Sequence, residues 1–453
     1  MQNIMTQEFD RKLFYRQIFK IGLPVVIQNL IQSLAALLDV FMIGQLGETQ
    51  ITAVSLGNQW IMLFFQLNNA ILAVGSMFIA QYWGKRDIES IHRIMGIIFT
   101  SSLTFTAIFT AFSYGFTEQI MSLYSSDPAV IASGVTYIRI AVICSVFVCV
   151  ESTLNTALTA TENTVVPLIT TMIALVMNLV LNFLLIFGNL GFPKLGVKGA
   201  AVATVISYSA ATFFVSVCTF VKKYDICARI KNYFSFSARL FKKFYKMGFF
   251  IIMCEVSFSI GINIYNIAYK YTGTNAQAAL QIVKNFQGIS MVLAIGIGTA
   301  QSVMLGKLLG ANKFDMAKTY FKKFIFLVPA SAFILSIITV AASPLFLSLF
   351  NIEPSTYNDA RNMLYLVIFI LPLSSLTFSI VVGTLRSGGD TVPCFTTNLV
   401  GVWMFGIPMT FLGAYLFPDK VWLVFLFQCS EEIGKIMVCL PRAFKYKWLK
   451  NIT

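Results

Sequence analysis

Apolar runs about as long as a lipid bilayer is thick recur along the whole chain, and they constrain its fold more than any other feature. A helix needs about 20 apolar residues to cross the hydrocarbon of a membrane. Of the 453 residues, 57% are hydrophobic and 11% are charged, whereas about 25% are charged in a typical soluble domain. A soluble fold would leave much of this apolar surface in water, so we expect the chain to lie in a bilayer.

The apolar runs are continuous and do not alternate with polar residues, so they predict membrane-spanning helices rather than the strands of a barrel. We expect an all-α, polytopic membrane protein with twelve transmembrane helices. The predicted spans are 17–43, 54–82, 92–116, 129–156, 165–187, 198–221, 246–269, 277–307, 320–342, 359–384, 394–417 and 420–441.

Positive charge is distributed unevenly between these spans. Most of the 33 Lys and Arg residues fall before the first span, after the last span and in every second loop. Cytoplasmic loops carry such an excess, so we expect a bacterial-type inner (plasma) membrane protein with both termini in the cytoplasm. This bias accounts for the net charge of +14. Because no basic soluble module accompanies it, we expect no nucleic-acid partner.

The chain also repeats itself at a constant offset of 226 residues. The pattern Pro-x-x-Thr-Thr at 167–171, for example, recurs at 393–397. Because each repeat contains six spans, both halves have the same orientation in the membrane. We expect an N-lobe at 1–221, a cytoplasmic connector at 222–246 and a C-lobe at 247–453. Two pseudo-symmetric lobes of six helices around a central cleft are typical of a carrier.

Asp39 is the clearest ionisable residue inside a predicted span. Such residues are costly in hydrocarbon and usually mark an ion or substrate pathway. At helical spacing, Gln28, Gln32 and Asp39 fall on one face of the first span. A carboxylate in this position can take up and release a proton or ligate Na⁺. The alternative is a residue at the membrane surface that caps a helix.

Two amides accompany this carboxylate in the prediction. Asn178 and Asn182 are four residues apart in the fifth span, so their side chains face the same way. They can hydrogen-bond to Asp39 or offer carbonyl oxygens to an ion. The alternative is that they join neighbouring helices by amide hydrogen bonds.

Glu255 lies nine residues beyond Lys246, which places it near the middle of the bilayer. It either pairs with a cation such as Lys284 or faces the cleft and attracts cationic substrates. Another pair, Glu431 and Lys435, is predicted near a cytoplasmic span end, where its spacing indicates an ordinary helix salt bridge.

Several catalytic signatures are missing from the sequence. No Gly-x-x-x-x-Gly-Lys-Ser/Thr motif is present, so ATP does not drive the protein through a site in this chain. The only histidine, His92, is predicted at the surface, and no His/Cys/carboxylate cluster indicates hydrolysis or a transition metal. We therefore expect a protein that is not an enzyme and has no cofactor.

The chain resembles the multidrug and toxic compound extrusion (MATE) family over essentially its whole length. The resemblance rests on the order and spacing of several motifs. These motifs are Ile-Gly-Leu-Pro at 21–24, Asp-Val-Phe-Met-Ile-Gly at 39–44, Ala-Gln-Tyr-Trp-Gly-Lys-Arg-Asp at 80–87, and the stretches 191–204, 296–311 and 385–393.

The resemblance implies a drug/cation antiporter whose two lobes alternate between outward-open and inward-open states. The first-span Asp that binds H⁺ or Na⁺ in the family matches Asp39, its fifth-span Asn partner matches Asn178, and the sixth-span Thr resembles Thr204. Some members carry an Asp where this chain has Asn182. Some also carry a C-lobe Glu, which Glu255 resembles.

We therefore predict a monomeric secondary antiporter that exports amphipathic, cationic organic compounds in exchange for H⁺ or Na⁺. The predicted ion-coupling residues, which would also hold Na⁺, are Asp39, Asn178, Asn182 and Thr204. The predicted substrate-cleft residues are Gln28, Gln32, Glu255 and Lys284. The alternative is a flippase of the same superfamily for lipid-linked precursors or peptide products, and the intramembrane cations Arg139 and Lys284 favour it.

Overall fold

The computed structural model describes residues 10–44, 47–272, 274–347 and 354–453. Every regular element among these residues is a helix, which confirms the all-α prediction. Up to residue 221 the helices are α1 (Arg11–Gly44), α2 (Glu48–Lys85), α3 (Ile88–Gly115), α4 (Thr117–Tyr124), α5 (Pro128–Ala141), α6 (Cys144–Ala160), α7 (Val165–Phe187), the short η1 (Asn189–Gly191) and α8 (Val197–Val221).

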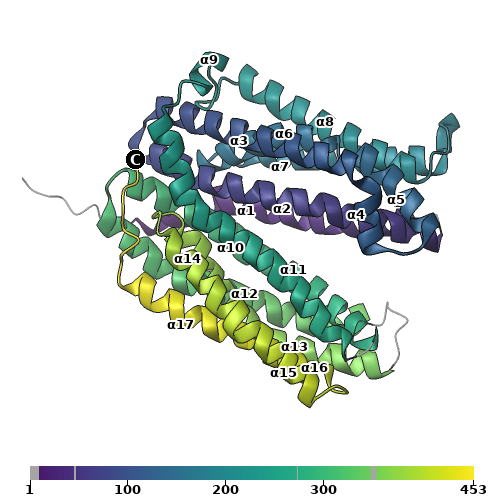
Figure 1. Ribbon diagram of the computed structural model, residues 1–453. Coiled ribbons are helices and arrows are strands. Elements are labelled where there is room, and N and C mark those ends of the chain that lie inside the picture. Colours follow the sequence, from purple (N-terminus) through teal and green to yellow (C-terminus); the bar gives the residue numbers. More distant parts are fainter. Residues whose placement is uncertain (1–9, 45–46, 273, 348–353) are drawn as a thin grey trace, which may run out of the picture. The chain divides into compact units, whose positions relative to one another are not determined.

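The rest of the chain is equally helical (Figure 1). Its helices are α9 (Ile230–Tyr233), α10 (Ala238–Lys270), α11 (Thr274–Gly310), α12 (Phe314–Leu347), α13 (Pro354–Phe378), η2 (Ser379–Leu385), α14 (Thr391–Asn398), η3 (Leu399–Gly406), α15 (Ile407–Leu416), α16 (Val421–Gln428) and α17 (Ser430–Phe444). The elements η2 and η3 are π-helical.

Fewer spans satisfy length and apolarity than the twelve expected. Among the described residues ten helices do so, and α5 with α6, which meet at 45°, add an eleventh if they form one span. This bent pair is the expected span 129–156. The expected span 420–441 is divided at Cys429 into α16 and α17, and α17 begins with charged residues. The last span is therefore interrupted and too polar to pass the same test.

The helices form two compact units. The first, unit 1, comprises residues 1–26, 80–86 and 245–453, and the second, unit 2, comprises 27–79 and 87–244. The division therefore cuts through α1 and through the end of α2. The expected lobes were continuous, whereas here the start of α1 and the end of α2 are grouped with the C-terminal half.

The helix ends of unit 2 follow from local side-chain chemistry. Asp87 precedes α3, and its side chain accepts a hydrogen bond from the backbone N–H of Ser90 at 3.0 Å. Asp127 caps α5 in the same way, with Pro128 at the first helical position, where a missing N–H costs nothing. Gly188 ends α7 with a φ of 75°, a left-handed conformation that glycine adopts without strain.

The core of unit 2 combines close helix packing with aromatic contacts. Helix α8 packs along both α6 and α7. The rings of Phe64 and Phe105 stack with their centroids 5.5 Å apart, and Trp60 stacks on Phe109 at 5.2 Å. The indole N–H of Trp60 donates to Ser113 at 2.8 Å. These contacts fix α2 against α3.

Unit 1 packs around α11, α12 and α13. Phe321 and Phe324 on α12 are fully buried there, and α13, α15, α16 and α17 lie together at the yellow-green end of the chain (Figure 1). Gly310 allows α11 to approach residues 80–86 closely, because a Cβ on it would lie 1.8 Å from the carbonyl oxygen of Gln81.

The last residues of the chain are part of unit 1. Trp448 is completely buried. The Gln81 amide donates to the carbonyl oxygen of Ser387 at 2.6 Å and accepts from the backbone N–H of Ile452 at 2.9 Å. One side chain thus joins the end of α2 to the segment after η2 and to the C-terminal tail, residues 445–453.

Candidate functional site

The four residues predicted to couple an ion lie together in unit 2. Asp39 comes from α1, Asn178 and Asn182 from α7, and Thr204 from α8. The Nδ2 of Asn182 donates to Asp39 Oδ1 and to Asn178 Oδ1, at 3.0 Å each. Asn178 Nδ2 is 3.5 Å from Thr204 Oγ1. Asn182 therefore stands between Asp39 and Asn178, and the group forms one chain of side chains across three helices.

Helical spacing brings the two amides together, and packing of α1, α7 and α8 adds Asp39 and Thr204. Asn178 and Asn182 are one turn apart on α7, so both amides reach the same side of that helix. The Thr204 hydroxyl donates to the carbonyl oxygen of Ala200 at 3.0 Å. Its oxygen thus remains an acceptor toward Asn178.

This cluster has an oxygen that lacks a hydrogen-bond partner. Asn182 is 3% exposed, and its Oδ1 atom has no partner. Buried amide oxygens are normally paired, and this one lies on the amide that already donates to Asp39. Carboxylate, amide and hydroxyl oxygens are the ligands that hard cations prefer. The arrangement has the chemistry to hold a proton on Asp39 or a monovalent cation among the oxygens.

The two glutamines of the same α1 face differ in environment. Gln28 donates from Nε2 to Thr171 Oγ1 on α7 at 2.8 Å, which joins the two helices that carry the cluster. Gln32 is exposed. Of the pair predicted to line a cleft, one is thus engaged within unit 2.

Glu255 pairs with a cation, which was one of its two predicted alternatives, but the partner is not Lys284. In unit 1 the Arg386 guanidinium donates to Glu255 Oε1 at 2.5 Å, and the Arg386 side chain is only 12% exposed. Arg386 follows directly on the π-helical η2. Arg386 therefore neutralises the charge that Glu255 was expected to offer a substrate.

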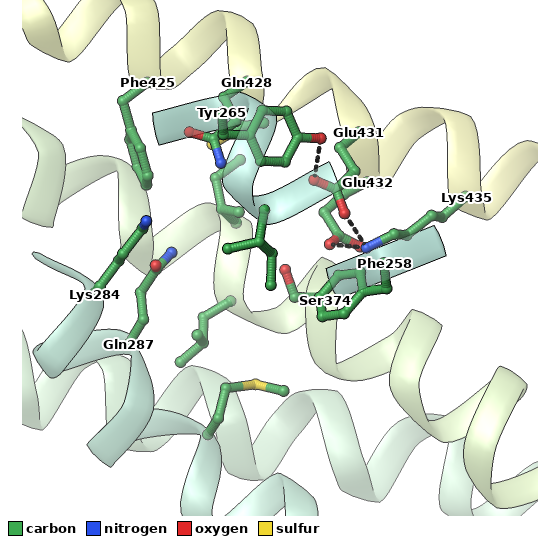
Figure 2. Close-up of a pocket in the computed structure, with 15 residues that line it drawn as sticks. Phe258, Tyr265, Lys284, Gln287, Ser374, Phe425, Gln428, Glu431, Glu432 and Lys435 are labelled. Carbon is green, nitrogen blue, oxygen red and sulfur yellow. Dashed lines mark hydrogen bonds and ion pairs between the residues drawn. The ribbon is translucent and has the colours of Figure 1, made fainter. Parts of the chain in front are cut away.

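A cavity of about 340 Å³ lies within unit 1 (Figure 2). Lys284 is among its lining residues, and Glu255 is not. Its walls come from α10, α11, α13, α16 and α17. The lining residues are Phe258, Ile262, Tyr265, Lys284, Gln287, Met291, Ile370, Leu371, Ser374, Phe425, Gln428, Cys429, Glu431, Glu432 and Lys435.

One wall of this cavity carries a buried cluster of charges. Lys435 forms ion pairs with Glu431 and, at 3.2 Å, with Glu432. The Tyr265 hydroxyl donates to Glu431 Oε2 at 2.7 Å, and the Thr377 hydroxyl donates to Glu432 Oε2 at 2.8 Å. Both glutamates are 8% exposed. We call these five residues the acid-pair cluster.

The sequence interpretation missed this cluster. It treated Glu431 and Lys435 as an ordinary surface pair near a membrane face, and the i, i+4 bond does exist. The missed signal is the context, because the charges follow directly on the apolar run 421–427 and include adjacent acids. Such a group inside a predicted span indicates a buried polar site.

The two clusters occupy corresponding places in the repeat. At the offset of 226 residues, Asp39 matches Tyr265, and Thr204 matches Ser430, which precedes the acid pair. The acid-pair cluster therefore takes its acids from the last span of the C-terminal repeat, and the Asp39 cluster takes its acid from the first span of the N-terminal repeat. The same scaffold positions hold different ionisable groups in the two halves.

Known proteins with similar sequences support the resemblance. A sequence model of the MatE family matches residues 24–184 and again 249–412. The probable multidrug resistance protein YoeA of Bacillus subtilis is 27% identical over 421 residues, covering 90% of this chain and 89% of that protein. The probable multidrug resistance protein NorM of Bacillus cereus is 25% identical over 423 residues, covering 90% of each.

Solved structures share the fold. A crystal structure of a MATE protein in complex with MaL6 has a TM-score of 0.86 at 19% identity, covering 96% of this chain and 97% of that one. A crystal structure of a mutant of the Vibrio cholerae MATE transporter VcmN has a TM-score of 0.87 at 16% identity, covering 97% and 99%. With the family match in both halves of the sequence, this chain belongs to the MatE family of membrane transporters.

Proposed function

We propose that this protein is a secondary antiporter that exports amphipathic, cationic organic compounds in exchange for H⁺ or Na⁺. The observation that carries the proposal is the hydrogen bond from Asn182 to Asp39, with the unpartnered Asn182 oxygen beside it. An ionisable group inside a span, bonded to an amide that links it to further polar side chains, is the arrangement that an ion-coupled carrier requires.

The mechanism follows from charge. We call Asp39, Asn178, Asn182 and Thr204 the α1–α7–α8 cluster. Binding of H⁺ or Na⁺ at Asp39 removes a negative charge from this cluster. The ion shifts the transporter between its open states only if its affinity differs between them. Asn182 is suited to this role, because its nitrogen holds Asp39 while its unpartnered oxygen can ligate a cation.

The relatives support the substrate class. YoeA and NorM are both named as probable multidrug resistance proteins, and the apolar walls of the unit 1 cavity suit an amphipathic compound. We further propose that both termini face the cytoplasm, as the distribution of Lys and Arg predicts.

The test uses purified protein in liposomes with an imposed proton or sodium gradient. Asp39→Asn should lower gradient-driven uptake of a fluorescent organic cation by about tenfold or more, within the usual range of coupling energies. Asp419→Asn, in the exposed loop before α16, is the matched control and should transport normally. If Asp39→Asn vesicles still concentrate the cation, the proposal is wrong. Comparing the two gradients identifies the coupling ion.

A second candidate is the flippase, and Lys284 favours it. An ammonium that lines a cavity inside a membrane unit can hold a phosphate or carboxylate headgroup. A lipid-translocation assay on the same liposomes separates the two functions. A fluorescent lipid phosphate that crosses the bilayer without any ion gradient would favour the flippase.

A further inference from the structure

The cavity of unit 1 has opposite charges on two of its sides. In Figure 2, Lys284 and Gln287 lie at one side, and Glu431, Glu432 and Lys435 lie at the other. Apolar side chains line the walls between them. The volume of about 340 Å³ is at the small end of the range of about 300–1,000 Å³ for ligand pockets.

The acid-pair cluster has a negative balance. Two carboxylates face one ammonium, because Lys435 is the only cation paired with Glu431 and Glu432 in the described part of the chain. Tyr265 and Thr377 contribute only uncharged hydroxyl donors. Buried charges are normally paired, so this side of the cavity matches one further positive charge.

The opposite side has a positive balance. Lys284 is half-buried, and its Nζ donates to the uncharged amide oxygen of Asn266 at 3.0 Å. Within the residues that the structure describes, it forms no ion pair. An ammonium has three donor hydrogens, so Lys284 matches one negative charge in the cavity.

We propose that this cavity binds small zwitterions, with the ligand's ammonium at the acid pair and its carboxylate at Lys284. The ligand ammonium competes there with Lys435. The Phe258 ring, whose centroid lies 5.6 Å from Lys435 Nζ, provides a second favourable position for a cation. The inference goes beyond the proposed function, because it assigns this cavity to zwitterions, a ligand class distinct from the cations named there, and it rests on that function only in taking the occupant to be a transported compound.

Charge complementarity distinguishes a zwitterionic ligand from a ligand that carries only a positive or only a negative charge. A plain cation leaves Lys284 without a counter-charge, and a plain anion leaves the acid pair without one. Mismatched charges across a buried contact reduce affinity and so provide selectivity.

The test is equilibrium binding to the full-length protein in lipid nanodiscs. Two aryl amino acids of different length, aminomethyl-benzoic acid and aminomethyl-biphenyl carboxylic acid, serve as zwitterionic probes. Their methyl esters are the matched cations, and their N-acetyl derivatives are the matched anions. At least one zwitterion should bind about tenfold more tightly than both of its derivatives, as one charge-assisted hydrogen bond provides. Equal or tighter binding of the esters overturns the proposal.

Variants assign each end of the ligand. Lys284→Gln should abolish the preference for the zwitterion over its ester, and Glu432→Gln should weaken the preference over the N-acetyl derivative. Lys198→Gln, which is exposed in unit 2, is the matched control and should bind all probes as the wild type does. If Lys284→Gln still prefers the zwitterion to its methyl ester, Lys284 does not bind the carboxylate and the assignment of that end is wrong. If Glu432→Gln does not fold, the wild type and Lys284→Gln still decide the question.

The same probes separate this inference from the proposed function. Asp39→Asn should retain the zwitterion preference in the binding assay while losing gradient-driven uptake. Suppose that the wild type transports substrate along an ion gradient but binds zwitterions no more tightly than their derivatives. That result refutes the cavity assignment and leaves the proposed function standing. Suppose instead that Asp39→Asn keeps the preference for zwitterions and still concentrates substrate. That result refutes the coupling mechanism and leaves the cavity assignment standing.

Discussion

At the scale of single residues, Asn182 has the most specific task in the α1–α7–α8 cluster. Its one amide nitrogen donates to two oxygens, Asp39 Oδ1 and Asn178 Oδ1. Asp39 does not bond directly to the amide that the family resemblance indicates as its partner. The orientation of Asp39 therefore depends on the residue at position 182.

Replacing Asn182 by Leu should uncouple transport without unfolding unit 2. The change removes the donor to Asp39 and the unpartnered oxygen together, and loss of a hydrogen bond to a charged group costs about 1.5–3 kcal/mol. If Na⁺ is the coupling ion, its apparent affinity, measured from transport against Na⁺ concentration, should fall by about tenfold or more, because an oxygen that can ligate the cation is lost. Val180→Leu, on the exposed side of the same helix, should leave that affinity unchanged. An unchanged affinity in Asn182→Leu would show that Asp39 needs no such bridge.

Lys435 is the residue on which the acid pair depends. Lys435→Met would leave Glu431 and Glu432 side by side without a cation, and breaking a buried ion pair typically costs about 3–5 kcal/mol. We expect a clear drop in the Tm of the purified protein. The triple variant Glu431→Gln/Glu432→Gln/Lys435→Met should recover most of that loss, because no unpaired charge remains. A triple variant as unstable as Lys435→Met would contradict this explanation.

At the scale of elements, close backbone approaches fix which helices can pair. Gly310 at the end of α11 approaches the Gln81 carbonyl, and Gly84 at the end of α2 approaches the carbonyl of Lys307. Each contact excludes any side chain, since a Cβ would lie about 2 Å from backbone atoms that cannot move away. These reciprocal contacts explain why residues 80–86 belong to unit 1.

Gly310→Ala should therefore destabilise the protein more than the addition of one methyl group suggests. Its Cβ would lie 1.8 Å from the Gln81 oxygen, and overpacking of this kind costs about 1–3 kcal/mol. The Tm in detergent should fall. Gly115→Ala, where nothing lies within 4 Å, is the matched control and should leave the Tm nearly unchanged. Equal Tm values for the two variants would mean that the α2–α11 contact carries no stability.

The helix elements themselves were largely predictable, because an apolar run of bilayer length has one stable conformation in lipid. The span 165–187 coincides with α7, and 198–221 differs from α8 by one residue. The interruption at Cys429 was not predictable from apolarity, because the run 421–427 looks like the start of an ordinary span. The apolar run ends before Glu431, Glu432 and Lys435, whose charges are stable at this position only because they pair in the folded protein.

At the scale of the whole molecule, the C-terminal tail is a structural part of unit 1. Trp448 is fully buried, and Gln81 bonds to the backbone of both Lys450 and Ile452. The tail packs an aromatic side chain into the core of unit 1.

Trp448→Ala should lower the stability of the protein by about 3–5 kcal/mol, the usual cost of emptying a buried aromatic site. The measurement is the Tm in detergent, together with the yield of monodisperse protein. Trp422→Ala, at a half-buried position on α16, is the comparison and should cost less. If Trp448→Ala has the Tm of the wild type, the tail is only loosely attached.

The membrane class, the helical content and the shared face of Asn178 and Asn182 follow from the sequence alone. Their signals are local, since a helix repeats at fixed rise and angle, so spacing tells which side chains share a face. Tertiary structure alone decided that Glu255 pairs with Arg386, that Asn182 lies between Asp39 and Asn178, and that the acid pair meets Tyr265. Those partners come from helices distant in sequence, and only packing determines which polar groups meet once water is excluded.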